Sequence, residues 1–102
     1  MNVIVLDQAK VEINQHIAWY RGRNPDSAQR LAKLFEKTLA DIATKPLRFS
    51  LMEMRRNPGN IRRARLKNFP IYIPFQVFDA DVYVLAVAHA ARRPGYWRKR
   101  LQ

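Results

Sequence analysis

The pattern of hydrophobic and polar positions at the start of the chain predicts a strand and then a helix. Val3 to Leu6 is a short aliphatic run, typical of a buried strand. Asp7 follows, and its carboxylate is placed to cap a helix. Apolar residues then recur at spacings of four, four and three, which is one helical face: Ala9, Ile13, Ile17 and Tyr20. We expect Gly22 to end this helix in a left-handed turn.

A second helix is predicted to begin at Asn24-Pro25. Asparagine is a favoured cap, and proline has the backbone angle of the first helical position. The apolar stripe of this helix consists of Ala28, Leu31, Phe35, Leu39 and Ile42. Lys45-Pro46 is expected to end it. The first half of the chain is therefore predicted to be a strand followed by a helical hairpin.

The second half predicts a sheet. After the turn-rich cluster Asn57-Pro58-Gly59-Asn60 come three strand-like runs: Ile61 to Lys67, Ile71 to Phe78 and Tyr83 to His89. Their short connections favour an antiparallel meander. Pro74 has no backbone N–H, so we expect a bulge or an unpaired edge there. The whole pattern predicts a single α+β domain over residues 1–102, with a basic tail over residues 90–102.

Composition excludes several classes of protein. A chain of 102 residues, 48% of them hydrophobic, has room for one core. It has no cysteine, two histidines far apart and no tight acidic cluster, so we expect no metal site, and with no phosphate-binding glycine loop we expect no cofactor. The start lacks the basic region of a signal peptide, and Val82 to Ala88, the longest apolar run elsewhere, is too short to span a membrane. We expect a cytoplasmic protein without a membrane partner.

Positive charge is concentrated in the second half of the chain. The net charge is +11, of which residues 46–102 carry +9, and 13 of the 19 basic residues are arginine. The planar guanidinium of arginine grips phosphate or carboxylate in two places at once. The partner is therefore expected to be a polyanion or an acidic protein.

The first basic cluster lies on the predicted strand Ile61 to Lys67. Alternation places Arg63, Arg65 and Lys67 on one face, at a repeat of about 6.5–7 Å that resembles the spacing of successive phosphates. Arg62 points to the other face. A solvated sheet face, protected by charge against aggregation, has the same pattern. We favour a binding surface, because these cations and those of the tail are interleaved with almost no acidic residues.

The second cluster runs from His89 into the tail. His89 and Tyr96 are candidates for proton transfer, and the candidate binding residues of this cluster are Arg92, Arg93, Trp97 and Arg98. The alternative is structural: His89 caps the sheet, the arginines are solvated, and the aromatic rings pack onto the core.

The remaining titratable groups are expected to be structural. His16 is expected to be a surface or half-buried residue of the first helix. Glu12, with Glu36 and Asp41, is expected to be an ordinary helix charge. Glu53 is predicted to form an ion pair with Arg55 or Arg56. Asp79 and Asp81 are expected to form a turn.

The order of elements, together with four short motifs, resembles the RelE/ParE toxin superfamily of type II toxin–antitoxin systems. The motifs are Arg63-Ala64-Arg65-Leu66, Tyr72-Ile73-Pro74-Phe75-Gln76-Val77, Val84-Leu85-Ala86-Val87-Ala88-His89 and Arg92-Arg93-Pro94-Gly95-Tyr96-Trp97. The resemblance implies a toxin neutralised by an acidic antitoxin, ParD-like or RelB-like. It also implies a target that is either DNA gyrase or messenger RNA on the ribosome.

The two branches of the superfamily imply different chemistry. RelE-like nucleases carry basic residues on the second strand and a tyrosine or histidine in the tail, which Arg63, Arg65 and Tyr96 match. Tyr72 stands where that branch has an arginine on the third strand. At the end of the fourth strand, where that branch has another arginine, Ala90 follows His89, and Arg92 is displaced by two residues from this position. These departures favour a ParE-like gyrase inhibitor. A ribosome-dependent, metal-independent mRNA endoribonuclease of RelE type and a basic nucleic-acid-binding module are the alternatives.

Overall fold

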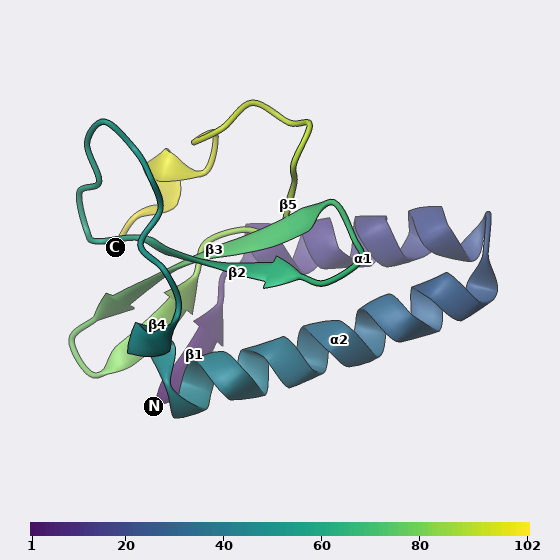
Figure 1. Cartoon of the computed structure of the whole chain (residues 1–102), viewed down its shortest axis with the longest axis horizontal. Helices are drawn as coiled ribbons and strands as arrows, with labels where there is room; N and C mark the ends of the chain where they lie inside the picture. Colours follow the sequence, from purple (N-terminus) through teal and green to yellow (C-terminus); the bar gives the residue numbers. More distant parts are fainter.

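A computed structural model describes residues 1–102 as a sheet covered on both faces. In Figure 1 the two long helices lie side by side along one face, and the loop after the second helix and the tail lie together on the other side. The first half of the chain contains β1 (Asn2–Val5), α1 (Asp7–Arg21), α2 (Pro25–Thr44) and the short helix η1 (Pro46–Arg48). This half confirms the predicted strand and helical hairpin.

The ends of α1 differ from the prediction in two details. Leu6, not Asp7, is the cap, because the backbone of Leu6 is still bonded to the sheet through Val84 O at 3.1 Å. Gly22 has φ −70° and is not left-handed. The connection is so short that Asn24 N donates to Tyr20 O at 2.6 Å. The chain enters α2 without a residue in the left-handed conformation. The predicted cap of α2 is confirmed, since the Asn24 side chain accepts from Ser27 N.

The second half forms the predicted antiparallel meander. It contains β2 (Arg62–Leu66), β3 (Ile71–Phe78), β4 (Asp81–Val84), β5 (Ala88–His89) and the short helix η2 (Arg98–Arg100). The sheet order is β1-β4-β3-β2, with β1 parallel to β4 and β5 paired with β3. The prediction of one strand from Tyr83 to His89 is wrong, because this run divides into β4 and β5.

The division is a bulge opposite Pro74. Phe75 pairs with Val84 and Tyr72 pairs with Ala88, so one strand carries one residue more than the other between these pairs. Pro74 has no N–H to donate, but its carbonyl accepts from Leu85 N at 2.9 Å. The bulge expected from Pro74 is thus confirmed, and its extra residue lies on the facing strand.

The sheet separates two hydrophobic clusters. The larger cluster joins the helical hairpin to the sheet and includes Ala9, Leu31, Ile42, Ile73 and Phe75. The smaller cluster, on the opposite face, consists of Ile61, Leu85, Ala86, Ala88 and Trp97, with loop and tail residues packed against it. The loop after η1 and the tail are therefore part of the folded core.

Candidate functional site

A groove on the face away from the helices brings the β2 cations next to the tail. It has a volume of about 420 Å³ and is lined by Met52, Glu53, Arg63, Arg65, Phe69, Pro70, Ile71, Tyr72, Ala90 and Pro94. Arg63 is half-buried and Arg65 is exposed. We call this feature the basic groove. It joins parts of the chain that the sequence placed in separate clusters.

Of the first basic cluster predicted on the strand Ile61 to Lys67, only Arg63 and Arg65 line the basic groove. Arg62 lies on the other face, where its guanidinium donates to Phe49 O at 2.6 Å and fixes the loop after η1. Lys67 lies in the turn after β2 and lines a different cleft, of about 700 Å³, which it shares with cations of α2. Glu53 lines the basic groove, and the expected ion pair with Arg55 or Arg56 does not form.

Trp97 does not belong to a binding surface. Its side chain is fully buried, and its indole Nε1 donates to Tyr72 Oη at 3.3 Å. The prediction of Trp97 as a binding residue is therefore wrong, and the structural alternative holds for this side chain. Arg93 and Arg98 are exposed.

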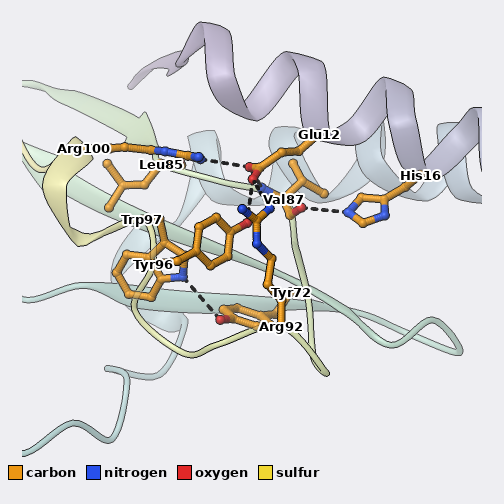
Figure 2. Close-up of polar contacts among 9 residues, drawn as sticks. All are labelled: Glu12, His16, Tyr72, Leu85, Val87, Arg92, Tyr96, Trp97 and Arg100. Carbon is orange, nitrogen blue, oxygen red and sulfur yellow. Dashed lines mark hydrogen bonds and ion pairs between the residues drawn. The ribbon is translucent and has the colours of Figure 1, made fainter.

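Glu12 organises the tail, a role that the sequence analysis missed. Its side chain is only 8% exposed, and it accepts from Tyr96 Oη at 2.6 Å and from Arg100 Nη1 at 3.0 Å. Arg92 Nη1 lies 3.4 Å from the same carboxylate. Figure 2 shows the side chains of Arg92, Tyr96 and Arg100 directed toward Glu12. Arg92, predicted to bind a ligand, and Tyr96, predicted to transfer a proton or to pack onto the core, thus converge with Arg100 on one internal carboxylate.

The bulge explains why Glu12 and His16 lie where they do. Both the N–H and the C=O of Val87 are bonded to side chains of α1: the N–H donates to Glu12 Oε1 at 3.1 Å, and the C=O lies 2.8 Å from His16 Nε2. Glu12 and His16 are one helical turn apart, on one face of α1. Arg100 completes the arrangement by donating to Leu85 O at 3.1 Å. The backbone groups of Leu85 and Val87 at the bulge are therefore satisfied by Pro74 and by side chains of α1 and the tail.

Tyr96 is poorly suited to proton transfer. Burial, together with the hydrogen bond to Glu12 and the negative charge of that carboxylate, raises the pKa of the Tyr96 hydroxyl well above its ordinary value. The phenol therefore stays protonated and bound to Glu12 at neutral pH. A general acid in this environment gives up its proton reluctantly.

His89 lies outside the basic groove. Its Nδ1 accepts from Ala91 N–H at 3.0 Å, and its ring lies 6.5 Å from that of His16, across a separate cleft. The structure therefore brings Arg63 and Arg65 next to the start of the tail, but it does not gather His89, Tyr96 and these arginines into one site. This arrangement does not favour the nuclease alternative.

Comparison with known proteins establishes the family. A model described as "ParE toxin of type II toxin-antitoxin system, parDE" matches residues 3–94. The chain belongs to the ParE toxin family. This membership confirms the toxin expected from the resemblance, on the ParE side of the superfamily. The family model ends before Tyr96 and Arg100, so two of the three tail side chains that contact Glu12 lie outside the matched residues, and Arg92 lies inside them.

A solved structure has the same fold as this chain. The chain from "Chromosomal ParDE TA system from P. aeruginosa" superposes with a TM-score of 0.74 over 87% of this chain and 95% of that chain, at 16% identity. At this identity the likeness concerns the fold alone. No curated protein matched in sequence. None of the helices has the length and apolar character needed to cross a membrane.

Proposed function

We propose that this ParE-family toxin inhibits growth by binding DNA gyrase and is neutralised by a cognate acidic antitoxin of ParD type. The observation that carries the proposal is the basic groove, where Arg63 and Arg65 adjoin the arginine-bearing tail. A surface of this kind binds an acidic protein and needs no acid–base pair. The solved relative comes from a ParDE system, which supports a ParD-like partner.

Supercoiling by purified gyrase tests the target. We expect the wild-type protein to inhibit supercoiling and the double variant Arg63→Ala/Arg65→Ala to inhibit it at least about tenfold less, because two rim cations are removed from the contact. The control is Arg21→Ala/Arg30→Ala, which removes two exposed arginines from the helical hairpin. Undiminished supercoiling at saturating wild-type protein would exclude gyrase as the target.

Antitoxin binding is tested separately. The reading frame adjacent to the gene for this chain is expected to encode a small protein with a DNA-binding N-terminal part and an acidic, amphipathic C-terminal part. Adding this protein before gyrase should restore supercoiling in proportion to the amount added. If the neighbouring protein does not bind the toxin, or binds it and leaves the inhibition of gyrase intact, this half of the proposal is contradicted.

A further inference from the structure

The cluster around Glu12 holds more positive than negative charge. Two guanidinium groups, of Arg92 and Arg100, approach one carboxylate, and the Tyr96 hydroxyl that also contacts it is neutral at pH 7. One positive charge is therefore left without a partner inside the protein. This charge lies at the outer edge of the cluster, because Arg92 is much more exposed than Arg100.

Arg100 is the satisfied arginine and Arg92 is the available one. Arg100 is 13% exposed and donates both to Glu12 and to Leu85 O. Arg92 is 56% exposed and reaches Glu12 through a single contact of 3.4 Å. A guanidinium has five N–H donors, so most of those of Arg92 are open to an external group.

Arg92 is also held in place. Its guanidinium carbon lies 3.8 Å from the centre of the Tyr96 ring, whose hydroxyl is fixed by Glu12. A long side chain that is ordered before binding loses less conformational entropy when it binds. Figure 2 shows Arg92 beside the Tyr96 ring and directed toward Glu12. Arg93 and Arg98, in the same tail, are exposed and take part in none of the ion pairs.

We propose that Arg92, positioned by Glu12 and Tyr96, is an anion-binding site that binds one carboxylate side chain of gyrase, the proposed target. A single carboxylate matches the single uncompensated charge and fits the two-pronged edge of the guanidinium. A nucleic-acid strand brings a row of phosphates close to the negative charge of Glu12, which disfavours it. This inference rests on the proposed binding of gyrase, and it assigns to Glu12 the role of a positioning residue.

Gyrase binding by matched variants tests the inference. We expect Arg92→Ala to weaken binding at least about tenfold and Arg93→Ala by less than about threefold, since only the first is held for binding. Arg92→Lys should not restore binding, because an ammonium lacks the planar fork. Glu12→Gln should weaken the wild type but add little to Arg92→Ala, because the two residues act as one unit. Equal effects of Arg92→Ala and Arg93→Ala on gyrase binding overturn the inference. Additive effects in the double variant Glu12→Gln/Arg92→Ala overturn it as well.

A second measurement does not depend on gyrase. The Nε–H resonance of Arg92 is followed by NMR during titration with acetate and, separately, with a single-stranded DNA dodecamer at matched ionic strength. We expect acetate to shift the Arg92 resonance and leave that of Arg93 unchanged. Equal shifts at both arginines show that no site exists at Arg92. A shift with DNA alone overturns the assignment of a carboxylate and indicates that the ligand is a phosphate. If the wild-type protein does not bind gyrase but its Arg92 resonance shifts with acetate, the proposed target is refuted and the anion-binding site at Arg92 is kept. Arg92 and Arg93 are both exposed, so this comparison does not depend on whether Glu12→Gln folds.

Discussion

At the scale of single residues, Glu12 is the side chain on which the tail depends. Replacing Glu12 with Ala leaves Arg100, which is nearly buried, without its carboxylate, and it removes the acceptor of Val87 N–H. Breaking a buried pair on one side costs about 3–5 kcal/mol. We expect the free energy of unfolding of Glu12→Ala, measured in urea, to fall by about that amount. Glu36→Ala, an exposed helix carboxylate, should change it by less than about 0.5 kcal/mol.

Tyr96 gives the protein an alkaline limit. Its pKa is raised in the folded state by burial and by Glu12, so folding favours the neutral phenol. In the unfolded chain the phenol ionises near its ordinary pKa of about 10. The stabilisation is thus complete below pH about 10 and is lost as the pH rises toward the folded-state pKa. Thermal unfolding between pH 8 and 11 should show this loss in the wild type and a shallower loss in Tyr96→Phe. Parallel curves for the two proteins contradict the assignment.

At the scale of elements, the bulge between β4 and β5 is held by α1. His16→Ala leaves the Val87 carbonyl without its side-chain partner, and an unpaired buried acceptor costs about 1–3 kcal/mol. We expect that loss in the free energy of unfolding, together with faster amide exchange of Val87 and its neighbours. Gln15→Ala changes an exposed neighbour on the same helix and serves as the control. A wild-type stability for His16→Ala indicates that water replaces the imidazole.

The elements could be predicted because their signals are local. The Asn24-Pro25 start of α2, the period of its apolar stripe and the missing donor of Pro74 are all readable from a few neighbouring residues. The site is different, because its contacts span long separations: Glu12 lies 84 positions from Tyr96 and 88 from Arg100. The one sequence hint is that Glu12 directly precedes Ile13 and so borders the apolar face of α1. Only the fold shows that the tail returns to that face.

At the scale of the whole molecule, the tail is both a surface and a part of the core. Trp97 is fully buried among Ile61, Leu85 and Ala88, while Arg98 and Lys99 beside it are exposed. A tail that only carried binding residues would be removable without harm to the fold. Here the smaller hydrophobic cluster is closed by the tail, so truncation changes two properties at once.

Comparing a chain that ends at Pro94 with a variant that changes only surface charges of the tail separates these two roles. The shortened chain lacks Trp97, whose replacement by alanine alone costs about 3–5 kcal/mol, and it leaves Glu12 without Tyr96 and Arg100. Domains of this size have about 5–15 kcal/mol of stability in total, so we expect the truncated chain to lose cooperative unfolding and near-UV circular dichroism and to bind hydrophobic dyes. Arg98→Ala/Lys99→Ala removes two exposed charges from the same segment and should unfold like the wild type. Loss of toxicity in the truncated chain then reports on folding, and loss in the double variant reports on contact with the target. A truncated chain that unfolds at the wild-type temperature shows that the smaller cluster does not depend on the tail.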